Sequence, residues 1–321
     1  MHAALVTTFG ETPRYREVPD PRATGPDEVV VDVLAAALSP RVRSQAAGTH
    51  YTSTDELPLV PGIDGVGRLP DGKLVYFLLP DTKRGAMAER VTVDLRRTIP
   101  LPKGADPIRI AATMNPAMAS WVALRQRIRF RRGQSLLILG ATGSSGRCAV
   151  QVGKRLGASR IVAVGRHAER MRDLTGLGAT RIVELEGPDA MGELAGAGKD
   201  VDVVVDLLWG EPTRKALEAI VPHRSSDEQR LTWIQIGSVA GPESAIPSAA
   251  LRAVNLQLIG SGQGSVPARS YRKEVAVLAK EVLKGTFHMA AREVRLSEVE
   301  AAWADTGSPE RIVLVPESAR R

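Results

Sequence analysis

Cysteine is nearly absent from this chain, which contains a single one, Cys148, among its 321 residues. One thiol excludes an internal disulfide and a structural zinc site built from four cysteines. Cys148 falls on the apolar face of a predicted helix, where a buried thiol is far more frequent than a reactive nucleophile. We therefore expect a structural role for this residue.

Aromatic residues and long apolar runs are also scarce. The chain has four tryptophans, four tyrosines and four phenylalanines, and the basic residues behind its net charge of +7 are dispersed. Few aromatic platforms and no basic cluster argue against nucleic-acid binding. No apolar stretch approaches the roughly 20 residues of a membrane span, and the first residues do not resemble a secretory signal. We expect a cytoplasmic protein whose positive surface attracts an anionic cofactor.

The pattern of the chain changes near residue 117. Before it, short β-branched runs at 2–6, 28–34 and 90–93 are separated by proline and glycine, which predicts a small barrel. After it, strands alternate with helices, which predicts an α/β fold with a doubly wound parallel sheet. A final strand, Arg311–Val315, is expected to rejoin the barrel. The predicted domains are 1–116 with 263–321, and 117–262. The predicted sheet strands are 135–139, 160–164, 181–185, 201–207, 231–236 and 256–260.

The strand at 135–139 leads directly into the glycine-rich sequence Gly-Ala-Thr-Gly-Ser-Ser-Gly, residues 140–146. An amphipathic helix with a glycine stop at Gly157 follows, and then a second apolar strand at the distance of a right-handed crossover. Such a turn aims backbone N–H groups and the positive end of the helix at an anion. The spacing differs from G-x-G-x-x-G, and an ordinary strand-to-helix turn is the alternative. The predicted pyrophosphate-binding residues are Gly140, Thr142, Gly143, Ser144, Ser145 and Gly146.

The end of the second strand indicates which dinucleotide binds. An NAD site normally places Asp or Glu there to accept hydrogen bonds from the ribose 2′-hydroxyl. This chain has Gly165, Arg166 and His167 instead, with Arg170 one helical turn further on. Guanidinium groups bind a 2′-phosphate with charge-assisted hydrogen bonds. We therefore predict NADPH as the cofactor, the alternative being that both arginines are solvated surface charges.

Three further sheet strands end in small or acidic residues. Gly237-Ser238 and Gly260-Ser261 follow the fifth and sixth predicted strands, where ligands of such sheets bind. We expect them near the nicotinamide half, with ordinary turns as the alternative. Asp206 ends the fourth strand and either accepts from the cofactor or caps a neighbouring element.

Several motifs together resemble the zinc-free quinone oxidoreductases related to zeta-crystallin, in the medium-chain dehydrogenase/reductase superfamily. This resemblance covers nearly the whole chain and implies a Rossmann domain, a GroES-like catalytic domain and a homodimer. The motifs are Val-Pro-Gly-Ile-Asp-Gly-Val-Gly at 60–67, Gly-Ala-Met-Ala-Glu at 85–89, Ala-Ser-Trp-Val-Ala-Leu at 119–124, the glycine turn at 140–146, the helix segment 149–158 and the strand 311–315.

The positions that bind zinc in zinc-dependent relatives are changed in this chain. Those relatives carry an early cysteine, where this chain has Ser39, and a Gly-His-Glu, where it has Gly62-Ile63-Asp64. Tetrahedral zinc requires four good donors, and only a carboxylate remains. We predict no catalytic metal and a structural hydrogen-bonding role for Asp64.

Without a metal, the favoured reaction is hydride transfer from NADPH to a quinone or an α,β-unsaturated carbonyl, which delocalises the developing charge. Tyr51 is the first candidate for orienting the acceptor or delivering a proton; Asn115 and His50 are weaker ones. The zinc-free relatives often show Asn-Pro-x-Asp where this chain has Ser39-Pro40-Arg41-Val42, so the substrate stays open. The alternatives are an enoyl or alkenal double-bond reductase and an NADPH-binding structural or regulatory protein.

Overall fold

The computed structural model describes residues 1–79 and 83–320, and the chain forms two compact units. The barrel unit comprises Met1–Asn115, Val275–Gly285 and Met289–Arg321, and the nucleotide unit comprises Pro116–Glu274 with Thr286–His288. The sequence-based domain boundaries, after residues 116 and 262, stay predictions. Residues 80–82 and 321, which the predicted barrel ranges include, lie outside the described residues.

The nucleotide unit is built on a six-stranded sheet in which every neighbouring pair is parallel. Its strand order, β10-β9-β8-β11-β12-β13, corresponds to 3-2-1-4-5-6 within the unit, which is the Rossmann order. The predicted fold class is therefore confirmed, although β11 is shorter than the predicted 201–207. The strands are β8 (Ser135–Leu139), β9 (Arg160–Gly165), β10 (Arg181–Glu184), β11 (Val203–Asp206), β12 (Leu231–Gln235) and β13 (Leu256–Gly260).

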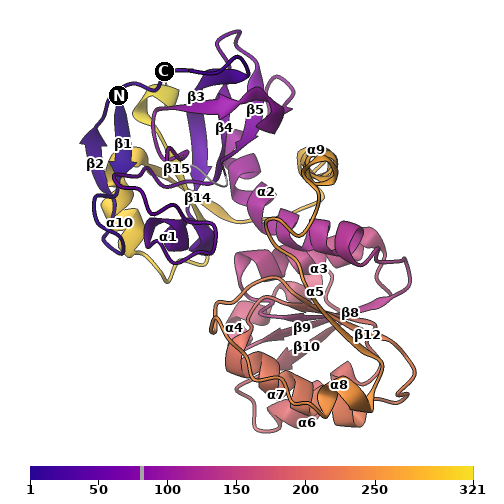
Figure 1. Cartoon of the computed structure of the whole chain (residues 1–321). Coiled ribbons are helices and arrows are strands. Elements are labelled where there is room, and N and C mark those ends of the chain that lie inside the picture. Colours follow the sequence, from indigo (N-terminus) through magenta and orange to yellow (C-terminus); the bar gives the residue numbers. More distant parts are fainter. Residues whose placement is uncertain (80–82, 321) are drawn as a thin grey trace. The chain divides into compact units, whose positions relative to one another are not determined.

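Helices cover both faces of this sheet, with α3 and α5 on one side and α6, α7 and α8 on the other (Figure 1). Each face of the sheet is apolar and must be shielded from water, which is why all residues of β8 are buried. Cys148 is buried on α3 and is in no disulfide. The helices are α3 (Ser144–Leu156), α4 (Ala168–Met171), α5 (Leu174–Leu177), α6 (Ala190–Gly198), α7 (Gly210–Ile220) and α8 (Ala250–Ala253).

The barrel unit contains a seven-stranded sheet and a two-stranded ribbon of β1 and β2. The C-terminal strand β15 pairs antiparallel with β3, with Leu314 opposite Ala36, so the end of the chain returns to the first unit as expected. The strands are β1 (His2–Leu5), β2 (Arg14–Glu17), β3 (Glu28–Ala37), β4 (Asp64–Arg68), β5 (Leu74–Leu78), β6 (Arg90–Asp94), β7 (Thr98–Pro100), β14 (Ala291–Arg295) and β15 (Arg311–Val315).

Four further α-helices lie in the described residues, besides short 3-10 and π segments. No described helix is long and apolar enough to cross a membrane. Two of them, α2 and α9, continue from one unit into the other along the sequence. The helices are α1 (Pro40–Ala46), α2 (Pro107–Val122), α9 (Ala268–Leu283) and α10 (Val299–Ala304).

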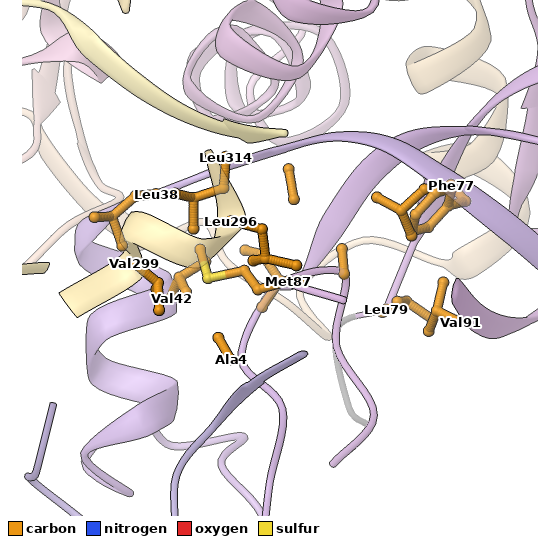
Figure 2. Packing of buried hydrophobic residues seen from close by; sticks show 14 of the residues in the cluster. Ala4, Leu38, Val42, Phe77, Leu79, Met87, Val91, Leu296, Val299 and Leu314 are labelled. Carbon is orange, nitrogen blue, oxygen red and sulfur yellow. The ribbon is translucent and has the colours of Figure 1, made fainter. Parts of the chain in front are cut away.

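The core of the barrel unit joins segments from both ends of the chain. Figure 2 shows Met87 grouped with Val42 of α1 and with Leu296 and Val299, which precede and begin α10. All four side chains are buried. The C-terminal segment is therefore part of the core of this unit. Its removal would expose the apolar face of β3 and α1 to water.

A buried carboxylate lies beside this core. Asp64 accepts a hydrogen bond of 2.6 Å from the hydroxyl of Tyr76, as the sequence predicted for a structural residue. Burial raises the pKa of Asp64 to about 6, although the Tyr76 hydrogen bond and the charge of Arg311 act in the opposite direction. Folding therefore extends the pH range in which Asp64 is protonated upward, to about pH 6.

Replacing this residue, as Asp64→Asn, tests its contribution. Because folding raises its pKa from 3.8 to about 6, its stabilising contribution is complete below pH 4 and is lost as the pH rises through 6. We expect the free energy of unfolding of the wild type to fall relative to that of the variant between pH 4 and 7, by up to roughly 3 kcal/mol. Urea unfolding at matched pH values measures this difference.

The difference in unfolding free energy between the wild type and Asp64→Asn excludes the effect of groups that titrate in both proteins, such as His50. The control is Asp32→Asn, which removes an exposed carboxylate from β3. A wild-type-minus-variant difference that does not change with pH would contradict the buried-carboxylate interpretation.

Candidate functional site

The glycine-rich turn begins immediately after β8. Gly140 has a φ of +86°, which favours glycine because L side chains rarely adopt it. The N–H groups of Gly140 and Ala141 both donate to the carbonyl of Val164 in β9, at 3.1 and 2.9 Å. These two hydrogen bonds thus hold the turn against the neighbouring strand β9.

The first turn of α3 packs directly against this turn. A Cβ atom on Gly146 would lie 2.1 Å from the carbonyl oxygen of Gly140 and 2.6 Å from Cα of Ala141. No side chain fits there, so glycine is required for the close approach. Gly143 differs, because a Cβ atom there would meet only the Gly140 oxygen, at 3.9 Å.

The N-terminus of α3 presents unengaged backbone donors. Gly143 is the N-cap residue and provides no side-chain cap, and the first intrahelical bond runs from the Arg147 N–H to the Gly143 carbonyl, at 2.9 Å. In the described part of the chain, no acceptor engages the N–H groups of Ser144, Ser145 or Gly146. These donors and the helix dipole fit the pyrophosphate of a dinucleotide.

The end of β9 lies beside the same turn, since a Cβ atom on Gly165 would lie 2.8 Å from Cγ2 of Thr142. Arg166 and Arg170 follow, and both side chains are exposed. Within residues 1–79 and 83–320 neither forms an ion pair, whereas Arg172, two residues further on, pairs with Glu169 at 2.8 Å. The two arginines therefore have the charge and exposure that a 2′-phosphate requires.

The turns after β12 and β13 lie at the same edge of the sheet. Gly237 donates its N–H to the carbonyl of Asp206, at 3.2 Å, and the buried Ser261 donates its N–H to the carbonyl of Gln235, at 2.8 Å. Ser238 is exposed, and the carbonyl of Gly260 accepts from Nε of Arg127 at 2.9 Å. Gly260 is the last residue of β13, and Gly237, Ser238 and Ser261 follow strand ends, so all four predicted residues lie at carboxyl ends of strands, where such sheets bind ligands.

Asp206 is fully occupied by internal donors, so the structure resolves its two possible roles in favour of capping. Its Oδ1 accepts the N–H groups of Leu208 and Trp209, at 2.9 and 3.0 Å. Its Oδ2 accepts from Thr213 and from the indole of Trp233, at 2.5 and 2.9 Å. The carboxylate holds the turn between β11 and α7.

The sequence analysis missed Trp209 in this turn. Its φ of +57° and ψ of −165° fall in a region that is almost restricted to glycine, at a cost of about 1–3 kcal/mol. The sequence signal was present, because this bulky residue stands two positions after the end of the predicted strand 201–207 and directly before Gly210. Strained residues cluster at functional sites.

The candidates in the barrel unit follow α1. Tyr51 is 70 % exposed, and its ring centroid lies 4.2 Å from that of His50. The guanidinium of Arg41 donates to the Thr52 hydroxyl at 2.6 Å, and that hydroxyl lies 2.9 Å from Nδ1 of His50. Burial, and then the charge of Arg41, lower the pKa of His50 to about 4. His50 is therefore neutral at physiological pH, and Arg41 is a cation that sequence reasoning did not single out.

Asn115 lies in α2 and is partly buried at the end of the barrel unit's first segment. Its side-chain amide has no hydrogen-bond partner among the described residues, so it retains donors and an acceptor for a ligand. Pro116 follows it within the helix and cannot donate a backbone hydrogen bond.

The positions related to zinc ligands have structural roles here. Ser39 is the N-cap of α1, and its hydroxyl accepts the N–H of Val42 at 3.1 Å. Ile63 is buried in the barrel core, and Asp64 accepts from Tyr76. In the described ranges, no group of three or more His, Cys, Asp or Glu residues could hold a metal ion.

Comparison with known proteins gives consistent similarities, although no protein-family model matches the chain. The chain is 31% identical to a protein described as a probable NADPH-dependent quinone reductase of Emericella nidulans, over 98% of this chain and 100% of that protein. It is 25% identical to a trans-enoyl reductase of Aspergillus terreus, over 59% of each chain.

A solved quinone oxidoreductase from Thermus thermophilus, described with its NADPH complex, matches over the whole fold. It has a TM-score of 0.81 and 25% identity, with 98% of this chain and 100% of that chain covered. The fold of this chain is thus shared with a solved quinone oxidoreductase.

The contact between α3 and the turn generates a prediction for Gly146→Ala. Because the added methyl group would overlap the Gly140 carbonyl, we expect the variant to lose roughly 2 kcal/mol or more of unfolding free energy. We expect Gly143→Ala, whose Cβ has space, to change it by less than about 1 kcal/mol. Urea unfolding of both variants measures this contrast, and equal stability of the two would refute the close contact.

Proposed function

Because the chain belongs to the quinone oxidoreductases of the medium-chain dehydrogenase/reductase superfamily, we propose that it transfers a hydride from NADPH to a quinone or an α,β-unsaturated carbonyl. The observation that carries the proposal is the glycine turn after β8, with the unengaged N–H groups of α3 and the exposed Arg166 and Arg170 beside it. Fold alone does not define activity. This site, however, has the backbone donors and the positive charges that a phosphorylated dinucleotide requires.

The residues proposed to hold the cofactor divide by function. Backbone donors of the turn bind the pyrophosphate, the two arginines bind the 2′-phosphate, and the turns after β12 and β13 bind the nicotinamide half. When bound, NADPH supplies the hydride. The proposed cofactor-binding residues are Gly140, Thr142, Gly143, Ser144, Ser145, Gly146, Gly165, Arg166, Arg170, Gly237, Ser238, Gly260 and Ser261.

On the acceptor side we propose Tyr51 as the group that hydrogen-bonds the acceptor oxygen or delivers its proton. Tyr51 is exposed, so it can reach a ligand. Nδ1 of the neutral His50 beside it accepts the Thr52 N–H at 3.2 Å, so Nε2 of His50 can donate one hydrogen bond. Asn115 is proposed as a further hydrogen-bonding residue. No metal is required, because a conjugated acceptor spreads the developing charge over its own π-system.

An enoyl or alkenal double bond is the second candidate acceptor, favoured by the similarity to the trans-enoyl reductase of Aspergillus terreus. The electron flow is the same for both, because each acceptor takes the hydride at a carbon conjugated with a carbonyl. The third possibility, an NADPH-binding protein with little turnover, makes the opposite prediction for cofactor consumption.

We further propose a cytoplasmic homodimer that binds no nucleic acid. The lone, buried thiol of Cys148 suits a reducing compartment. In the described sheet, β13 is an edge strand, and an edge strand of one copy can pair with that of another. The basic residues are dispersed along the chain, and aromatic platforms for bases are few.

An acceptor panel tests the proposed reaction. We expect quinones or enones to cause a loss of reduced-nicotinamide absorbance, and Tyr51→Phe to lower kcat by about tenfold or more while changing KM little. Tyr15→Phe, in which the changed hydroxyl bonds Glu317 from β2, is the control and should keep wild-type turnover. NADPH binding without consumption by any acceptor would refute the enzyme assignment, and unchanged turnover of Tyr51→Phe would remove that residue from the mechanism.

Removing the two arginines tests the choice of cofactor. Charge-assisted hydrogen bonds contribute roughly 1.5 to 3 kcal/mol each, so we expect Arg166→Ala and Arg170→Ala each to weaken NADPH binding by one to two orders of magnitude. NADH affinity should change little, because NADH lacks the 2′-phosphate. Calorimetric titration of both cofactors measures the change.

The control for these two variants is Arg172→Ala, because Arg172 is an exposed arginine of the same segment that pairs with Glu169. Arg172→Ala should keep the wild-type preference for NADPH over NADH. Equal affinity of the wild type for NADH and NADPH would disprove the arginine assignment.

A further inference from the structure

Trp209 occupies a backbone conformation that suits glycine rather than tryptophan. Its φ of +57° and ψ of −165° place a bulky side chain where steric overlap with its own backbone is severe. The following residue, Gly210, also has a positive φ, of +65°, and is a glycine. A glycine at position 209 would relieve the strain, so the backbone geometry of the turn does not explain why this residue is a tryptophan.

The surrounding structure forces this conformation. Oδ1 of Asp206 accepts the N–H groups of Leu208 and Trp209, and its Oδ2 accepts from two side chains. Asp206 is fully buried, and breaking these bonds would leave its carboxylate without partners. A strained residue persists where its neighbours determine it in this way.

This turn lies at the edge of the sheet that carries the nucleotide turn. A Cβ atom on Gly140 would lie 2.8 Å from Cδ2 of Leu208, the residue before Trp209. On its other side, the carbonyl of Leu208 accepts the N–H of Ala240, in the segment after β12, at 2.9 Å. Trp209 therefore lies between the segments to which we assign the pyrophosphate and the nicotinamide half.

The indole of Trp209 lacks the polar partners that the two most buried indoles have. Trp121 and Trp233 are buried, and their indole N–H groups donate to Glu274 and Asp206 at 2.9 Å. Trp209 is partly exposed, and in the described residues its indole has no hydrogen-bond partner and no ring contact. Part of its aromatic surface thus remains accessible at the ligand-binding edge.

We infer that the indole of Trp209 packs against the bound dinucleotide and is an affinity-determining residue of this chain, an inference that rests on the proposed function. A nucleotide offers flat rings and ribose faces, and an indole offers a rigid apolar face with little conformational entropy to lose. The strain of the turn is then offset when the cofactor binds.

Trp209→Gly separates this role from a structural one. Glycine adopts the observed φ and ψ freely, and this relief of strain opposes the lost packing and the greater entropy of the unfolded chain. We therefore expect the unfolding temperature of the variant to differ little from that of the wild type. We expect its Kd for NADPH to rise by about tenfold, the size of one aromatic stacking contact. Trp209→Phe, which keeps a ring, should restore most of the affinity, and Trp209→Ala should not. Calorimetric titration and thermal unfolding measure both quantities.

An unchanged Kd for Trp209→Gly would overturn the inference. An equal loss of affinity in Trp209→Phe and Trp209→Gly would do the same, because it would mean that the cofactor does not contact an aromatic ring at this position. These outcomes leave the proposed function intact, provided that the wild type binds NADPH. If the wild type does not bind NADPH, the proposed function fails, and the inference fails with it.

Discussion

The close approach of α3 to the end of β8 is the constraint on which the nucleotide site depends. The helix can begin where it does because Gly146 has no side chain and its backbone meets the Gly140 carbonyl. A side chain there would displace the first turn of the helix, and with it the N–H groups that point outward. The same contact therefore fixes the helix against the sheet and creates the donors for an anion.

Charge at this edge is distributed so that the carboxylate of Asp206 is bonded internally, whereas the guanidinium groups of Arg166 and Arg170 form no ion pair among the described residues. Asp206 is surrounded by four donors and fixes the β11 turn, so it does not repel an incoming phosphate with an unsatisfied charge. Arg166 and Arg170 remain exposed at the end of β9. An anionic ligand with an additional phosphate on its ribose is the ligand that such an arrangement favours.

In the barrel unit, burial rather than exposure determines the charge of the key polar groups, because it shifts their pKa values. Burial keeps His50 neutral, and it raises the pKa of Asp64. A neutral imidazole beside the exposed Tyr51 offers hydrogen bonds without a formal charge, which suits an uncharged quinone or enone. The positions related to zinc ligands instead cap α1, fill the core and bond Tyr76.

The sequence by itself determined where the sheet strands lie along the chain and that they form a doubly wound parallel sheet, together with the glycine turn and the two arginines after β9. These features are local: strands are apolar runs, turns need glycine, and a missing carboxylate is visible in one segment. Only the tertiary structure decided the capping role of Asp206, the strain at Trp209 and the association of Arg41, Thr52 and His50. Each of these depends on which donors and acceptors long-range packing brings together, and periodicity in a single segment carries no information about that.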